Sequence, residues 1–493
     1  MLHNQQLGAF YPNSSVSLLN FSFEEYRKNA LKYFTTMRAS NSNIPAGILS
    51  DNVENPDLDE IQLPLTRAHE LDHYLLMNST PFGLLIWRMY MAISTGVSYL
   101  LRKTEDYIDD SFFLPIHEWY LKSACHRMDK NMHVLMRLPV DVVASLDLRV
   151  LPHFSRLLLG KEKITMRRFI DIANAAFKIL STRGGLQTEL EWTAHNPGRE
   201  SYLPDEGFST TEIIEANARV KELFMLNHAG FSKKQIEQWR KRSIFGVYKP
   251  VFDWIMDELG NDIFIRIAIE QALITPIDLS CYAGYKGKIY VEDVLPAWRL
   301  QKVVKSMQSF VWNMKDRESV NSLLLEQICA KANIPTPKTT LENLLQTPIK
   351  GKVGWEGDLI FQPENSRLSL NEYYQYTEDE FLKMFRVRLQ NYYLHILPDK
   401  PFLFEPLFEL YENYAHAPHS RFENEDFEIR YSQTFYKIIT DIVNLSLIGN
   451  GDIRILKNIV KSFMDGQMTP EGEDLLNNYP IIRKLKDHLI WDI

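Results

Sequence analysis

The sequence has few cysteines and no excess of basic residues. Its 493 residues include three cysteines, Cys125, Cys281 and Cys329, which are far apart and form no CxxC pair. Neither a thiolate zinc site nor a disulfide framework is therefore expected, and the cytoplasm, a reducing compartment, is the expected location. The formal net charge of −8 provides no basic surface for phosphate groups, so we expect no nucleic acid among the partners.

Signals for a membrane are also missing. The N-terminal residues lack a positively charged start followed by an apolar run, so no secretory signal is expected. One apolar stretch, Pro81 to Leu101, has the roughly 20 residues that a bilayer span needs. It carries Arg88 near its start, however, and a charge inside a span costs about 2.5–3.5 kcal/mol. We therefore expect a buried helix here and no membrane partner.

Several common catalytic motifs are absent as well. The chain contains no Walker A or G-x-G-x-x-G pattern, so nothing in it supports a nucleotide-dependent enzyme. It has no G-x-S-x-G elbow and no cysteine in a recognisable catalytic setting, which argues against a nucleophilic hydrolase. These absences leave metal-dependent chemistry and non-catalytic binding as the classes to compare.

The patterns that are present indicate a mainly α protein with a few short strands. Hydrophobic residues make up 45% of the chain and charged residues 24%, a balance typical of globular proteins. Capping boxes predict helices over Ser22 to Ser40 and over Ser209 to Phe231. Glycines among β-branched and aromatic residues favour short strands or loops in Cys281 to Val294 and Ile349 to Phe361.

The length of the chain predicts two or three domains, since a single core rarely grows this large. We expect an N-terminal helical segment and linker in residues 1–60 and a metal-binding helical domain in residues 61–240. A second, mainly helical domain is expected in residues 241–493, with a candidate linker near residues 332–340.

One short motif carries most of the chemical information. His69-Glu70-Leu71-Asp72-His73 fits H-E-x-x-H, and residues four apart on a helix share a face, so both imidazoles can point at one ion. Zinc accepts imidazole nitrogen and keeps one position for water in catalytic sites. Glu70 lies about 100° round the helix, from where it can reach that water as general base.

The motif resembles the active-site helix of the HExxH zinc metalloproteases, the zincins. That resemblance implies a Zn²⁺-dependent hydrolase, most plausibly a metallopeptidase acting on a peptide or protein substrate. The sequence departs from the pattern at Asp72, because the two interior positions are normally uncharged. The metzincin extension is absent, since Leu76 and Ser79 stand where Gly and His would be, and Ala92 lies near the place of a close downstream glutamate.

The third metal ligand must then come from farther along the chain, and Glu215 is the best candidate. It sits one turn inside a capped helix among small or apolar neighbours, and the segment resembles the glutamate-bearing helix of gluzincins. Glu222, two turns on, and Asp72 are candidate second-shell residues or alternative ligands. Glu189 and Glu191 are the next choices as ligands. A solvated or paired helical glutamate remains the alternative for Glu215.

The same residues allow two interpretations other than a zincin. A di-iron carboxylate bundle needs two E-x-x-H motifs, and the chain contains one, at Glu70 to His73. The stronger alternative is a non-catalytic helical binding or scaffold protein, or an inactive zincin relative. In that case His69 and His73 would be core histidines whose hydrogen bonds are satisfied by Asp72 and by backbone groups.

Overall fold

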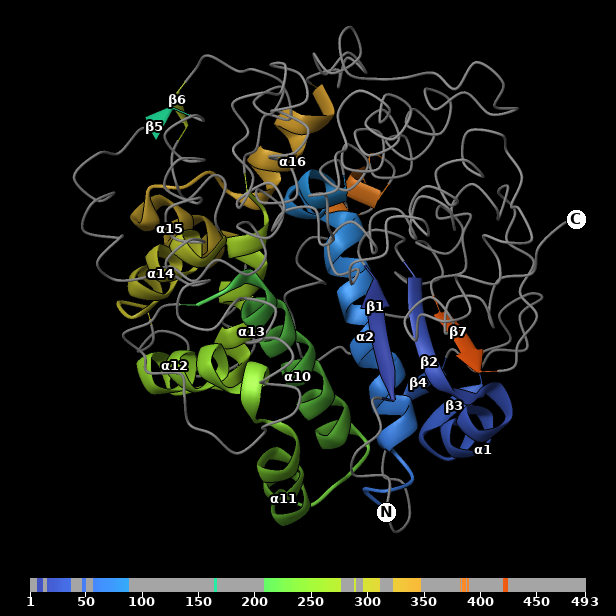
Figure 1. Cartoon of the computed structure of the whole chain (residues 1–493). Coiled ribbons are helices and arrows are strands. Elements are labelled where there is room, and N and C mark those ends of the chain that lie inside the picture. The colour runs from blue at the N-terminus through green and yellow to red at the C-terminus, as the bar shows by residue number, and fades with distance from the viewer. Residues whose placement is uncertain are drawn as a thin grey trace, which may run out of the picture.

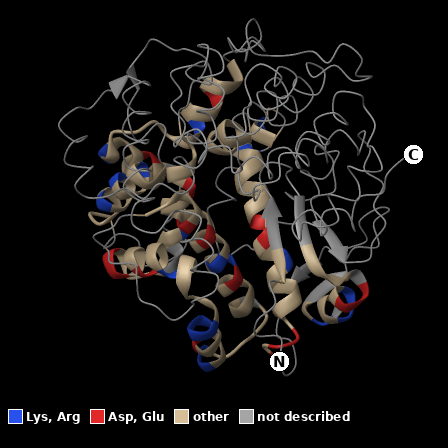
Figure 2. Cartoon of the chain, viewed as in Figure 1, with Lys and Arg blue, Asp and Glu red and all other residues tan. Residues whose placement is uncertain are grey.

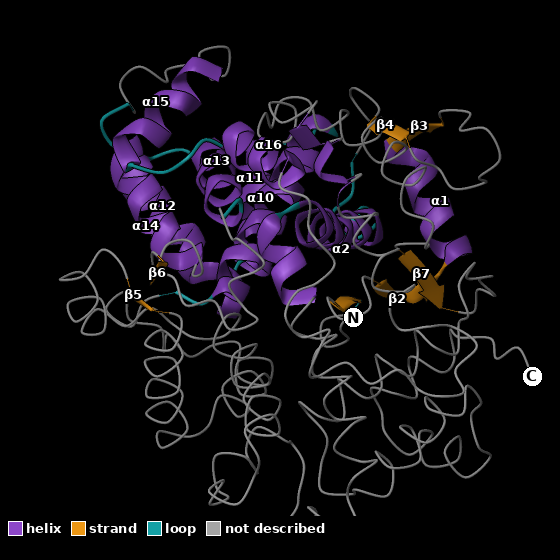
Figure 3. Cartoon of the chain, turned by 90° about the horizontal axis from the view of Figure 1, so that it is seen from above, coloured by secondary structure: helices purple, strands orange, loops and turns teal. Residues whose placement is uncertain are grey.

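The structure is a computed structural model of the chain, and its described part is mainly helical, as predicted (Figure 3). Among the described residues, no helix is both long and apolar enough to cross a membrane. The residues described are 7–11, 16–36, 47–49, 56–87, 164–165, 208–275, 288–289, 296–310, 322–346, 382, 384–386, 388–389 and 420–423.

The helices fall into two groups along the chain. The N-terminal group has α1 (Phe23–Tyr33) and α2 (Gln62–Ser79). The second group follows residue 207. It consists of α10 (Thr210–His228), α11 (Lys233–Ser243), the 3₁₀ turn η3 (Gly246–Tyr248), α12 (Lys249–Leu259), α13 (Asp262–Leu273), α14 (Pro296–Met307), α15 (Ser322–Ala332) and α16 (Pro337–Gln346).

The strands in the described part of the chain are short and form three small sheets. The largest sheet has the order β1-β2-β7, in which β1 and β2 are antiparallel, β2 and β7 are parallel, and Gly8 lies opposite Leu19. The strands are β1 (Gly8–Tyr11), β2 (Val16–Ser22), β3 (Phe34–Thr36), β4 (Gly47–Leu49), β5 (Ile164–Thr165), β6 (Lys288–Ile289) and β7 (Ser420–Glu423).

The two long helices α2 and α10 lie side by side at the centre of the described part (Figure 1). On one side of the pair, β1 and β2 lie against α2. On the other side, α10 contacts α12, α13 and η3, and α13 packs on α14. Residues 61 and 64–65 and all residues from 69 to 87 are buried, so α2 is enclosed by its neighbours rather than laid on a surface.

Capping explains where several helices begin. Ser209 Oγ accepts a hydrogen bond from the Glu212 backbone N at 3.2 Å, and the Ser209 backbone N donates to Glu212 Oε2 at 2.7 Å. Ser22 and Glu25 form the same reciprocal pair at 3.2 and 2.9 Å. Both predicted capping boxes are therefore confirmed, and each satisfies backbone N–H groups that a helix start leaves without partners.

Other predictions for local structure had mixed outcomes. The helix expected over Ser22 to Ser40 ends at Tyr33, because the next three residues pair as β3 with β4. The Cys281 to Val294 segment contributes strand β6, and the part of Pro81 to Leu101 that is described, residues 81–87, is helical and buried, as expected. The Ile349 to Phe361 segment lies outside the described residues, and the domain boundaries stay a prediction.

Candidate metal site

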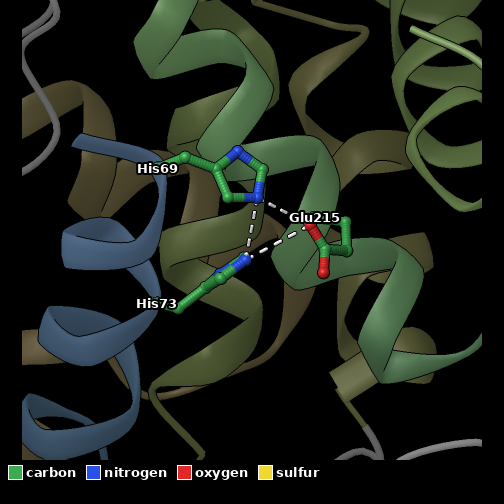
Figure 4. A group of neighbouring side chains, drawn as sticks. All are labelled: His69, His73 and Glu215. Carbon is green, nitrogen blue, oxygen red and sulfur yellow. Dashed lines mark hydrogen bonds and ion pairs between the residues drawn. The ribbon is translucent and has the colours of Figure 1, made fainter. Parts of the chain in front are cut away.

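Two histidines and one glutamate converge at the interface between α2 and α10. His69 Nε2 lies 2.9 Å from Glu215 Oε2 and 3.0 Å from His73 Nε2. His73 Nε2 lies 3.2 Å from the same carboxylate oxygen. Figure 4 shows the two rings, one turn apart on α2, directed at the Glu215 carboxylate from α10. His69 and Glu215 are 146 positions apart in the sequence, so tertiary packing of the two helices brings them together.

The size of this triangle fits a small divalent ion. Zinc binds imidazole nitrogen and carboxylate oxygen at about 2.0–2.2 Å, and ligands of a tetrahedral site then lie about 3.3 Å apart. The three observed separations, 2.9, 3.0 and 3.2 Å, are within a few tenths of an ångström of that value. The group of His69, His73 and Glu215 can therefore hold a metal ion.

The hydrogen bonds of His69 also favour a cation between these three side chains. Its Nδ1 lies 2.7 Å from Glu222 Oε1, so the proton on that side is donated to a carboxylate. In a neutral ring, Nε2 then carries a lone pair that faces a carboxylate oxygen and a second imidazole nitrogen. Three lone-pair atoms within about 3 Å of one another repel unless a cation, either a proton or a metal ion, lies among them.

The pKa shifts of His69 and Glu215 also favour a positive charge between these side chains. Burial lowers the pKa of His69, but its hydrogen bonds to Glu215 and Glu222 outweigh that effect and raise the pKa to about 10. Burial raises the pKa of Glu215, whereas the electrostatic interaction with His73 and hydrogen bonds to both histidines bring it well below its usual range. Each partner thus stabilises the charged form of the other.

Formal charges give a simple count. The carboxylates of Glu70, Glu215 and Glu222 and the guanidinium of Arg219 interact across the site. With both histidines neutral, three negative groups and one positive group leave a charge of minus two. A divalent cation neutralises this set without any further residue.

Glu70 lies beside the cluster without joining it. Glu70 is 6% exposed, and burial raises the pKa of its carboxyl, although electrostatic interactions with His69 and His73 oppose that shift. Strand β1 approaches it closely, since a Cβ built on Gly8 would lie 2.9 Å from both Glu70 Cγ and Oε1. A buried carboxylate next to the histidines has the raised affinity for protons that a general base requires.

A second layer surrounds His69. Arg219 NH1 donates to both oxygens of Glu222, at 2.9 and 2.7 Å, and Glu222 in turn accepts from His69. The Arg219 guanidinium lies 4.0 Å from the centre of the Tyr248 ring, and that ring meets the His69 ring edge-on at 5.8 Å. Glu222 thus contacts His69 Nδ1 directly, and its role at a metal site stays a prediction, whereas Arg219 and Tyr248 were not anticipated.

Asp72, the unusual residue of the motif, takes part in a separate network of buried polar and charged side chains. It accepts a hydrogen bond from Asn217 Nδ2 at 2.6 Å and lies 3.8 Å from Lys221 Nζ and 3.6 Å from an Arg266 nitrogen. Charged residues of both signs occur along α2, α10 and α13, and α10 packs on both of the other helices (Figure 2). The network ties together α2, α10 and α13 next to the group formed by His69, His73 and Glu215.

A residue from far along the chain completes this network. Arg388 donates to Ser79 Oγ at 2.9 Å and pairs with Glu270, which also lies 3.9 Å from Arg266. The side chains of Arg388 and Glu270 are each 2% exposed. Residues separated by 309 positions, Ser79 and Arg388, therefore meet in one buried polar cluster.

The remaining candidate ligands are placed as follows. The structure brings His69, His73 and Glu215 together, with Glu70 and Glu222 beside them, while the described contacts of Asp72 are to other groups. Glu189 and Glu191 lie outside the described residues.

The helical spacing of Glu215, Arg219 and Glu222 is the signal that could have revealed Arg219, because positions i, i+4 and i+7 share one helix face. Tyr248 carries no comparable local signal, since a short turn places it at the site.

Comparison of the chain with protein-family models, curated protein sequences and solved structures finds no match.

Proposed function

We propose that this protein is a zinc-dependent hydrolase of the metallopeptidase class, in which His69, His73 and Glu215 hold the ion. The observation that supports it most directly is the convergence of two imidazole nitrogens and one carboxylate oxygen within 3.2 Å of one another. Nitrogen and oxygen donors of this kind suit zinc, and three protein ligands leave a tetrahedral ion one further position, as catalytic zinc sites do.

The arrangement of helices also supports a zincin-like organisation. Two ligands lie one turn apart on α2, and the third lies on a separate helix that packs along it. The motif resemblance and this geometry agree on Glu215 as the third ligand. We propose a peptide or protein as substrate and, from the scarcity of cysteine, the cytoplasm as location.

In this proposal each residue has a distinct role. A divalent ion supplies Lewis acidity, which polarises a carbonyl group and makes a water molecule easier to deprotonate. Glu70 accepts the proton of the attacking water on its carboxylate and passes it to the leaving amine. Glu222 fixes the His69 ring by accepting from Nδ1 and leaves Nε2 available to the ion.

Metal content is the first test. Full-length protein purified without chelators is expected to carry about one zinc per chain by elemental analysis. His73→Ala and Glu215→Gln should lose the ion, while Glu237→Gln, the same chemical change on the exposed face of α11, should retain it. Wild-type protein that binds no divalent ion under these conditions would contradict the proposal.

Catalysis is the second test. Glu70→Gln is expected to keep its zinc and to lose hydrolysis by at least about 100-fold, because general base catalysis contributes roughly 10²–10⁴ in rate. A mixture of synthetic peptides analysed by mass spectrometry reports cleavage without assuming a sequence preference. Zinc-loaded wild-type protein that cleaves nothing in such a mixture would favour a non-catalytic binding protein instead.

A further inference from the structure

We propose that Arg219 is a positioning residue for the metal centre, acting through Glu222 on the orientation of His69. This inference deepens the proposed function and rests on its metal-binding part. Arg219 lies one turn after the ligand Glu215 on α10, and its guanidinium faces the same side of the helix as Glu222. Its described hydrogen bonds and ion pair are with Glu222.

The chain of contacts from Arg219 to the ligand is short. Arg219 NH1 donates to Glu222 Oε1 at 2.9 Å and to Oε2 at 2.7 Å, and the same Oε1 lies 2.7 Å from His69 Nδ1. Both oxygens of Glu222 are thus held from one side while one of them binds the histidine on the other. A carboxylate held this way cannot turn about its terminal bond without losing a charge-assisted hydrogen bond.

Arg219 is itself fixed by aromatic rings from a different part of the fold. Its guanidinium lies 4.0 Å from the ring centre of Tyr248 in η3 and 5.8 Å from that of Trp239 in α11. Tyr248 also meets the His69 ring at 5.8 Å. Arg219, Glu222, His69 and Tyr248 therefore form a closed ring of contacts that links α2, α10 and η3.

Burial distinguishes this pair from an ordinary ion pair on a helix surface. Exposed pairs three residues apart contribute little to stability and orient nothing, because solvent screens them and both side chains move. Here the Glu222 side chain is 2% exposed and that of Arg219 is 17% exposed. This buried carboxylate is held by the Arg219 guanidinium on one side and by the N–H donor at His69 Nδ1 on the other.

The expected effect follows from what outer contacts of metal-binding histidines contribute. Loss of a group that orients such a histidine typically weakens metal binding by 10–100-fold. Arg219 acts one step farther out, so Arg219→Met should weaken zinc binding by about tenfold, at the lower end of that range. Arg219→Lys should restore only part of the affinity, because lysine keeps the charge but lacks the flat guanidinium that lies over the Tyr248 ring.

The test compares Arg219→Met with Arg240→Met in the full-length chain. Arg240 is a suitable control because its guanidinium also lies over an aromatic ring, that of Phe252 at 4.8 Å, but has no described contact with the site. Zinc affinity is measured by competition with a chelator, and the visible absorption of the Co²⁺-loaded protein reports the geometry of the ligands. Arg219→Met should weaken affinity and alter the Co²⁺ spectrum, whereas Arg240→Met should change neither.

A double variant shows whether Arg219 acts through Glu222. If it does, adding Arg219→Met to Glu222→Gln should weaken zinc binding no further than Glu222→Gln alone. Full additivity, or wild-type affinity and an unchanged Co²⁺ spectrum in Arg219→Met, would overturn the inference while leaving the proposed function intact. An equal loss in Arg240→Met would show a general effect on folding. Wild-type protein that binds neither Zn²⁺ nor Co²⁺ would overturn the proposed function and this inference together.

Discussion

Replacing Asp72 by Asn should destabilise the protein severely, although the two side chains have nearly the same shape. Asp72 is 1% exposed and is the negative partner of two buried cations, Lys221 at 3.8 Å and Arg266 at 3.6 Å. Each contact contributes a gross attraction of about 4 kcal/mol at the effective dielectric constant of about 20 that fits protein sites. Desolvation of the charges offsets a large part of this attraction.

The net effect can be taken from buried ion pairs broken on one side, which typically lose 3–5 kcal/mol. We expect about 3 kcal/mol for Asp72→Asn, since the amide can still accept the hydrogen bond from Asn217 and Arg266 keeps Glu270 at 3.9 Å. The free energy of unfolding falls because Lys221 and Arg266 stay buried with less negative charge around them.

The assay is urea unfolding followed by far-UV circular dichroism, which reports the helices that dominate the described fold. Asp253→Asn is the matched control. Asp253 pairs with Lys249 at 2.5 Å on α12, but both side chains are substantially exposed, so the same change should alter the free energy of unfolding by less than about 0.5 kcal/mol. Equal unfolding midpoints for the two variants would refute the assignment of Asp72 to a stabilising network.

Three further predictions concern glycines and the ion. Gly8→Ala should keep its zinc but lose hydrolysis, because the new Cβ would lie 2.9 Å from Glu70 Oε1 and displace the proposed base. Gly83→Ala should prevent stable folding, with a loss above about 3 kcal/mol by urea unfolding, because its Cβ would overlap the backbone carbonyl of Met77. Removing zinc with a chelator should lower the thermal unfolding midpoint, and zinc at 100 times its dissociation constant should restore about 2.7 kcal/mol.

Each of these predictions has a result that would contradict it. Wild-type turnover in Gly8→Ala would mean that the base moves aside freely or that Glu70 is not the base. A normal unfolding midpoint in Gly83→Ala would show that the backbone there has room to shift. Gly260→Ala serves as a comparison, because Gly260 ends a helix with a φ of 72°, a conformation that alanine rarely adopts. A thermal unfolding midpoint that the chelator does not change would show that the ion does not stabilise the fold.

The sequence predicts those features that depend on neighbouring residues. The helical class and both capping boxes follow from spacing and from the few residues that satisfy free N–H groups. The shared face of His69 and His73 follows from the helical repeat in the same way. Glu215 could be proposed because small neighbours allow two helices to approach, and the structure places it 2.9 Å from His69. Its role as a metal ligand stays a prediction.

Features that depend on packing between distant segments could not be predicted. Nothing near Asp72 in the sequence indicates that Lys221 and Arg266 will surround it, so its charge looked out of place within the motif. The end of α1 at Tyr33 was missed for the same reason, because the following residues are held by strand β4 rather than by their own preference for helix. Tyr248 reaches the site through a turn whose direction is set by α11 and α12.

The contact of Arg388 with Ser79 and Glu270 has a consequence for the order in which the chain becomes stable during its synthesis. The ribosome releases His69 and Glu215 long before Arg388, and at 5–20 residues per second the 309 residues after Ser79 take about 15–60 s to make. Until Arg388 emerges, the carboxylate of Glu270 has Arg266 at 3.9 Å as its nearest described cation. Glu270 on α13 therefore lacks its Arg388 partner while the 118 residues between them are made, and a chain released before residue 388 would retain that incompletely neutralised carboxylate.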